Sequence, residues 1–164
     1  MGQNQIELRA AFGRFMTGVT VVTALDDAGT PVGFTANSFS SVSLNPPLLL
    51  VCPGAHLSSF EVFRKAETFG VSVLAADQEN VSRLFSTGTG ARFDQCEWQP
   101  AAAGVPMIEG RAAGFVCETA NRVPAGDHLI VIGQIIAFDD TDAPGLGYGP
   151  EGYFSIGHQR LSVD

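Results

Sequence analysis

Short apolar runs alternate with turns rich in Gly, Pro, Asn and Asp along the whole chain. Runs of β-branched and aliphatic residues that are bounded by such turns are typical of β-strands. The pattern predicts strands at six places: 19–25, 48–52, 68–76, 112–123, 128–138 and 151–156. The segment 26–33, DDAGTPVG, has the composition of a turn, so the strand before it should form a hairpin with the apolar residues that follow. From His128 to Ile132 the run is unbroken, which predicts a strand buried on both faces.

Helical spacing is confined to three short stretches. Apolar residues recur at intervals of three and four over about 6–17, which predicts a helix there. A second helix is predicted over 58–68, where Ser58 and Glu61 have the spacing of a capping box. A third is predicted over 77–86.

The segment from Ser86 to Gly104 is rich in Gly and Ala with mixed charge and is predicted to be a long loop, which in a compact domain is more often functional than idle. Many strands, short helices and no regular strand–helix alternation favour a mainly β, antiparallel barrel over a doubly wound sheet. Neither a repeat nor a low-complexity linker divides the sequence, so residues 1–164 are expected to form one domain, with a flexible tail over 157–164.

Charge and hydropathy narrow the possible partners. Nine Lys and Arg residues against 17 Asp and Glu give a net charge of −8. Because nucleic-acid affinity comes mainly from cationic side chains at phosphates, no nucleic-acid partner is expected. The longest apolar runs fall well short of the roughly 20 residues that span a bilayer, so no membrane association is expected. The first residues also lack the basic and apolar segments of a signal peptide. Only 16% of residues are charged, against about 25% in typical domains, which hints that a second subunit covers part of the surface.

Cysteine and histidine usage argues against metal and disulfide chemistry. The three cysteines, Cys52, Cys96 and Cys117, are odd in number and widely spaced, which favours neither a disulfide framework nor a zinc site. A reducing, cytoplasmic location is therefore expected. The three histidines at positions 56, 128 and 158 are also far apart, without metal-ligand spacing, so no metal is expected.

Three segments with polar side chains could bind a ligand. The stretch 35–41, TANSFSS, places small hydroxyl and amide side chains between apolar strands. It is either a surface turn or bulge, or a shelf for the polar edge of a flat heteroaromatic ligand. Ser58 and Ser59 follow a Gly-containing turn and could present a helix N-terminus to a phosphate, although an ordinary N-cap is the commoner reason for serines at this position. Arg92 beside Phe93 is either a phosphate clamp with a ring cover or a solvated charge next to an anchoring aromatic residue.

Taken in this order, these pieces resemble the short-chain flavin reductases of two-component monooxygenases. The resemblance is carried by RFMTGVTVVTA, by GFTANSFSSVSLNPPLLLVC and by GDHLIVIGQI, and it extends from about Phe12 to Ile156. It implies an antiparallel split β-barrel of the FMN-binding split-barrel type. Such a protein is usually a homodimer and binds FMN or FAD. Such a protein would transfer a hydride from NADH or NADPH to the flavin, and the reduced flavin would diffuse to a partner monooxygenase.

The resemblance also implies which residues would form the site. The cofactor-binding set would be Phe34, Thr35, Ala36, Asn37, Ser38, Ser40, Ser41, Cys52, Pro53, Gly54, Ser58, Ser59, Arg92 and Phe93. The nicotinamide would contact His128, the implied catalytic residue, and Tyr153. Lys stands more often than Arg at the position of Arg92, a change that keeps a phosphate contact. No role is predicted for Cys96 and Trp98, and His158 is expected to be a solvated tail residue.

His128 admits more than one interpretation. It is either a nicotinamide-positioning residue or a buried residue that caps the start of a strand. Because adjacent strand residues point to opposite faces, no direct pairing with Asp127 is expected. Two other functions stay open: a flavin-binding or electron-carrier protein without productive nicotinamide binding, and a heme or pyridoxal-phosphate protein on the same barrel.

Overall fold

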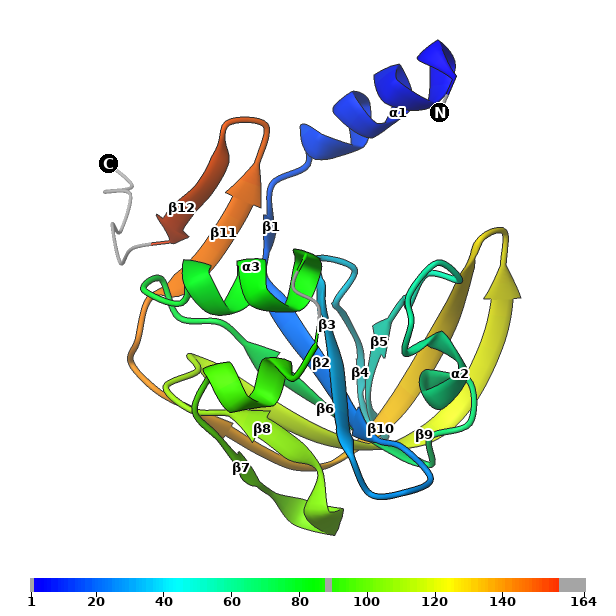
Figure 1. Cartoon of the computed structure of the whole chain (residues 1–164), viewed down its shortest axis with the longest axis vertical. Helices are drawn as coiled ribbons and strands as arrows, with labels where there is room; N and C mark the ends of the chain where they lie inside the picture. The colour runs from blue at the N-terminus through cyan, green and yellow to red at the C-terminus, as the bar shows by residue number, and fades with distance from the viewer. Residues whose placement is uncertain (1, 88–89, 157–164) are drawn as a thin grey trace.

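The computed structural model describes residues 2–87 and 90–156, so the predicted tail 157–164, with His158, lies outside the described residues. Its centre is an antiparallel seven-stranded sheet with the order β3-β2-β6-β9-β10-β5-β4 (Figure 1). The strands are β2 (Thr20–Leu25), β3 (Pro31–Ala36), β4 (Ser40–Leu44), β5 (Pro47–Val51), β6 (Thr68–Val73), β9 (Ala113–Ala125) and β10 (His128–Asp140). The predicted hairpin is confirmed, since β2 pairs with β3 from Thr20↔Ala36 to Leu25↔Pro31.

The two edges of this sheet are consecutive in the chain. β3 and β4 stand at opposite ends of the strand order, yet only residues 37–39 separate Ala36 from Ser40. Four residue steps span at most about 14 Å, so the sheet must curl until its edges are neighbours. The two edges do not pair with each other, which leaves a seam and makes the fold a split β-barrel. The predicted fold class is confirmed.

The core lies inside the curled sheet. Alternate residues of the central strands point inward, among them Val22, Phe69, Val71 and Val131, each no more than 2% exposed. On β10 the inward residues are buried, but Ile130 and Ile132 on the other face are only half-buried. The prediction of a strand buried on both faces is therefore wrong for the isolated chain.

Smaller sheets and a helix flank the barrel. β1 (Thr17–Gly18), β11 (Gly145–Gly149) and β12 (Gly152–Ile156) form a three-stranded sheet, and β7 (Trp98–Pro100) pairs with β8 (Pro106–Ile108). α3 (Glu79–Thr87) packs Val81 and Phe85 into a second apolar cluster. The predicted loop over 86–104 is largely wrong: it holds the end of α3, the 3₁₀ turns η1 (Arg92–Gln95) and η2 (Ala102–Gly104), and β7.

The other two helices differ from their predicted bounds. α1 (Gln3–Gly13) starts earlier and ends earlier than the predicted 6–17, and none of its residues is buried. It projects away from the barrel in Figure 1. α2 (Phe60–Phe63) is a single turn rather than a helix over 58–68. Among the described residues, no helix has the length and apolar character needed to cross a membrane.

Candidate functional site

The polar stretch 35–41 forms the seam of the barrel. Thr35 and Ala36 end β3, residues 37–39 cross between the two sheet edges, and Ser40 and Ser41 begin β4. Edge strands leave backbone N–H and C=O groups without ladder partners. These groups, together with the exposed side chains of Asn37, Ser40 and Ser41, give the seam many short hydrogen-bonding groups. The polar segment therefore lies where the two edges of the sheet approach each other.

Hydrogen bonds fix both ends of the crossing. The Thr35 hydroxyl donates to the Ser82 carbonyl on α3 at 2.6 Å. At the other end, the Ser38 hydroxyl accepts from the Cys52 N–H at 3.0 Å. Phe34 is buried edge-on against Phe63, with ring centroids 4.9 Å apart. Its side chain therefore belongs to the core, and only its backbone can meet a ligand.

The turn after β5 is tied to the start of β10. The Pro53 carbonyl accepts from the Leu129 N–H at 3.0 Å, and the Ala55 N–H donates to the Asp127 carbonyl at 2.9 Å. Gly54 forms an isolated bridge with His128. The sequence-predicted residues Cys52, Pro53 and Gly54 are thereby brought to His128, although more than seventy positions separate them in the chain.

The predicted capping box at α2 is wrong. The helix begins at Phe60, its N-cap is Ser59, and Ser59 makes no side-chain capping bond. Glu61 instead accepts from Arg64, whose Nη2 lies 2.6 Å from the carboxylate. A single helical turn offers little dipole, so any anion binding by Ser58 and Ser59 must come from the residues around them.

Those surroundings form a cleft of about 710 Å³, which is lined by Ser58, Ser59, Gly33, Arg92, Phe93 and Trp98 among others. Four separate segments meet there. The Arg92 guanidinium donates to the Gly33 carbonyl at 2.9 Å, which holds the side chain against β3. Phe93 packs edge-on against Phe85 and Trp98, with centroids 5.1 and 5.5 Å away. Trp98, for which no role was predicted, therefore supports the aromatic wall. The volume is typical of a small-molecule site.

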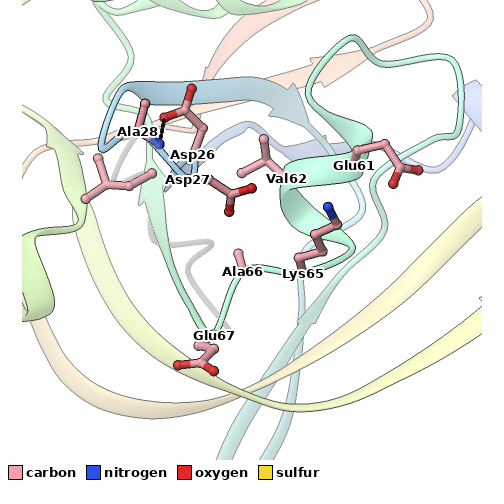
Figure 2. A pocket seen from close by; sticks show the side chains of 9 residues that line it. Asp26, Asp27, Ala28, Glu61, Val62, Lys65, Ala66 and Glu67 are labelled. Atoms are coloured by element: carbon pink, nitrogen blue, oxygen red, sulfur yellow. Dashed lines mark hydrogen bonds between the residues drawn. The ribbon is translucent and has the colours of Figure 1, made fainter.

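A second cleft of about 600 Å³ lies beside it and shares Asp26 and Val62. Figure 2 shows the β2–β3 turn facing α2 across this cleft, with Asp26, Asp27, Glu61 and Glu67 around it and Lys65 the one cation on its wall. Asp26 is already committed to its own turn, because its carboxylate accepts from the Ala28 and Thr30 N–H groups. Four carboxylates would repel a phosphate. The cleft around Arg92 has two carboxylates, Asp26 and Asp94, against its guanidinium, and it therefore suits a nucleotide better.

His128 pairs directly with Asp127. Its Nδ1 lies 2.8 Å from the Asp127 carboxylate oxygen Oδ1, so the expectation of no pairing is wrong. Asp127 is a turn residue rather than a strand residue, and the alternation rule does not apply to it. Gly126, with φ +62°, and Asp127 make the two-residue hairpin turn between β9 and β10, where glycine at the first position is preferred. The hydrogen bond from His128 holds the pKa of the Asp127 carboxyl below its ordinary value.

Tyr153 lies at the other end of the seam. Its hydroxyl shares a 2.9 Å hydrogen bond with the Ser82 hydroxyl, and Ser82 is the residue whose carbonyl accepts from Thr35. The Arg83 guanidinium stands 5.1 Å from the centre of the Tyr153 ring. Among the described residues, no hydrogen bond or ring contact joins Tyr153 to His128. The seam lies between them, with Tyr153 at the Thr35 end and His128 at the Cys52–Gly54 end.

Sequence reasoning missed three residues: Ser82, Asp127 in its pairing role, and His56. Ser82 occupies a position on α3 that carries no sequence signal. The Gly-Asp dipeptide before a strand is a hairpin signal and could have placed Asp127 in a turn. His56 packs against His128, with ring centroids 6.3 Å apart. Among the described residues, no group of three His, Cys, Asp or Glu side chains is arranged to hold a metal ion.

Comparison with known proteins identifies the family of this chain. The family model described as "Flavin reductase like domain" matches residues 12–157. The chain is 48% identical over 157 residues to the reductase component of a flavin-dependent trigonelline monooxygenase from Acinetobacter baylyi, covering 96% of this chain and 51% of that protein. It is 44% identical over 156 residues to an FMN reductase (NADH) from Agrobacterium fabrum, covering 94% of this chain and 88% of that protein.

Solved structures give the same result. An NADH:FAD oxidoreductase of Streptomyces globisporus, determined in complex with NAD and FAD fragments, superposes with a TM-score of 0.87 at 35% identity, over 99% of this chain and 95% of that one. The chain spans about half the length of the first curated relatives that it matches, 48% and 51%.

Proposed function

Because this chain belongs to the flavin reductase like domain family, we propose that it is a flavin reductase, which transfers a hydride from a nicotinamide dinucleotide to FMN or FAD. The observation that carries the proposal is the seam between β3 and β4, with a nucleotide-sized cleft at Ser58 and Arg92 and with His128 beside the Cys52–Gly54 turn. Of the two donors, NADH is favoured over NADPH, since the relatives whose names give a donor use NADH. The match over 12–157 supports one flavin reductase domain in residues 1–164.

The residues present fit a flavin. The seam offers unpaired backbone groups and short hydroxyls for the polar edge of the ring system, from Thr35 to Ser41. The phosphate would lie in the cleft, where Ser58 and Ser59 face Arg92 and where Phe93 adds an apolar wall. The chemistry that a bound flavin supplies is hydride acceptance, and the protein supplies binding, orientation and electrostatics.

His128 would orient the nicotinamide. A neutral imidazole that donates its Nδ1–H to the Asp127 carboxylate keeps Nε2 as a hydrogen-bond acceptor. That atom can receive the amide N–H of a nicotinamide carboxamide. Hydride transfer between two stacked rings needs position more than proton removal. His128 is thus assigned to dinucleotide positioning, and Tyr153, held by Ser82, to the opposite end of the seam.

A steady-state assay at 340 nm tests the function. The purified chain should oxidise NADH only when FMN or FAD is added, and a matrix of both dinucleotides against riboflavin, FMN and FAD ranks the substrates. The variant His128→Ala should raise the dinucleotide KM or lower kcat with flavin affinity unchanged. The absence of flavin-stimulated consumption with either dinucleotide would contradict the proposal. Flavin binding without such consumption would favour a carrier.

The proposed partners are a second copy of the chain and a monooxygenase. The outer-face patch consists of Leu48, Leu50, Val123, Ile130 and Ile132. Leu48, Leu50, Ile130 and Ile132 are half-buried on strands whose alternate residues belong to the core, and Val123, which lies opposite Ile130, is exposed. Such an apolar surface is typical of a subunit interface. Relatives named as reductase components of monooxygenases support diffusion of reduced flavin to such an enzyme. Three free cysteines support a reducing, cytoplasmic setting.

A further inference from the structure

Two imidazole rings lie over Gly54. A Cβ atom built on Gly54 would stand 2.5 Å from His56 Cε1, 2.7 Å from His56 Nδ1 and 3.2 Å from His128 Nε2. The first two separations are shorter than real Cβ contacts, so only glycine leaves room for the His56 ring in this position. The two rings meet edge to face, with an interplanar angle of 72°.

The backbone around His56 is fixed by the same turn that holds His128. The Leu57 N–H donates to the Gly54 carbonyl at 3.0 Å, on one side of His56. On the other side, the Ala55 N–H donates to the Asp127 carbonyl. The hydrogen-bonded turn therefore places the His56 side chain beside the His128 ring.

The bond between Asp127 and His128 is too exposed to hold the ring alone. The His128 side chain is 42% exposed and that of Asp127 is 91% exposed. Solvent-exposed pairs of this kind contribute little, and an unrestrained ring would lose rotamer freedom when a ligand binds. A second contact on the ring reduces that loss.

We propose that His56 is a positioning residue of the nicotinamide site, which packs against the His128 imidazole so that Asp127 and His56 together fix its orientation. The inference rests on the proposed function. A metal site is the rival use for two histidines and a carboxylate, but among the described residues no such group has ligating geometry. The Nδ1 atom of His128 is also already bonded to Asp127.

Kinetics of His56 variants test the proposal. His56→Ala should raise the KM for NADH by about three- to tenfold, the scale of ordering one side chain, with a smaller change in kcat and no change in flavin KM. His56→Phe keeps the ring contact and should restore the KM to near the original value. An NADH KM within twofold of the original protein in His56→Ala, or an equal rise in flavin KM, would overturn it.

A double-mutant cycle and NMR separate positioning from general damage. If His56 acts through the His128 ring, the NADH KM of His56→Ala/His128→Ala should equal that of His128→Ala, whereas additive effects of the two substitutions would overturn the inference. The ¹H and ¹⁵N signals of the His128 ring should shift in His56→Ala. If the unmodified protein shows no flavin-dependent NADH oxidation, the proposed function fails, while the NMR comparison still decides whether His56 orders His128.

Discussion

Gly133 shows how little space single residues have in this barrel. It lies on β10, and a Cβ there would stand 2.5 Å from Phe69 Cζ and 2.7 Å from Cys117 Cβ, both within the core. Since the Cys117 Cβ cannot move without its backbone, Gly133→Ala should overpack the core and lower the free energy of unfolding by about 1–3 kcal/mol. Urea unfolding measures this. Gly145→Ala, where nothing lies within 4 Å, is the control. Equal stabilities of the two variants would contradict the packing argument.

The Cys117 thiol should be inert in the folded protein. Its side chain is fully buried, and burial raises its pKa to about 12. At pH 8 only about one molecule in ten thousand would carry the reactive thiolate. Ellman's reagent should therefore modify Cys117 only after unfolding in guanidinium chloride. Peptide mapping of the labelled protein identifies the modified cysteine. The Cys117→Ser variant is the control, because it should lose one reactive thiol in the unfolded protein and none in the folded protein. Labelling of Cys117 at the same rate before and after unfolding would refute its burial.

The Asp127 carboxyl reports on its bond with His128. The His128 hydrogen bond favours the charged carboxylate and so holds the pKa below the ordinary value of 3.8. The carboxylate form, and the bond with it, is kept above that pKa and lost as pH falls through it. In His128→Ala the Asp127 pKa should rise toward the ordinary value, measured from the ¹³C carboxyl shift against pH. An unchanged midpoint would show that the pair does not form in solution.

Local patterns predicted elements well where the chain pairs with itself nearby. The β2–β3 hairpin and the strands at β5, β6, β9, β10 and β12 were all predicted from apolar runs between turns. β11 was missed because its sequence, GLGYG, has three glycines and no β-branched residue, and it is held by pairing with β1 and β12. The region 86–104 was predicted as loop because packing of Phe93 against Phe85 and Trp98, and not local propensity, orders it.

A Ser58→Ala variant tests whether Ser58 caps α2 or binds a ligand. Because α2 begins at Phe60 and no side chain caps it, Ser58→Ala should change the free energy of unfolding by less than about 0.5 kcal/mol. A capping serine would cost about 1 kcal/mol. The flavin KM should rise severalfold, since Ser58 lines the cleft with Arg92. Ser86→Ala on α3 is a matched control, and a loss of stability without a change in flavin KM would restore the capping interpretation.

The site itself depends on the topology of the whole molecule. The composition of TANSFSS was compatible with either a surface turn or a polar shelf, and its position at the seam follows from non-local pairing of β6 with β2 and β9. The meeting of Pro53 and Gly54 with His128 is likewise set by the strand order. Sequence patterns name residues with suitable chemistry, whereas distances between them across the barrel are fixed only by closure of the sheet. The seam, the Arg92 cleft and the His56 contact therefore could not be predicted from the sequence and were found only in the structure.

Association is the property of the whole molecule that the surface most directly predicts. Leu50 lies opposite Ile132 and Val123 lies opposite Ile130 on the outer face, and Ser40 of the seam pairs with Leu50. A second copy on this patch would also adjoin the proposed flavin site. α1 strengthens the case, because an isolated helix of this length is marginal in water and exposes Phe12.

Sedimentation velocity should therefore show a dimer for the unmodified chain. Ile132→Glu places a charge in the centre of the outer-face patch and should shift the protein to monomer, because burying an unpaired carboxylate is costly. Far-UV circular dichroism checks that the variant stays folded. Ala28→Glu, in the exposed β2–β3 turn, adds the same charge elsewhere and should stay dimeric. If Ile132→Glu remains a folded dimer, the interface lies on another surface, with α1 the next to test. If the unmodified chain is instead a monomer at all concentrations, the dimer prediction is wrong, and the half-buried Ile130 and Ile132 side chains face solvent.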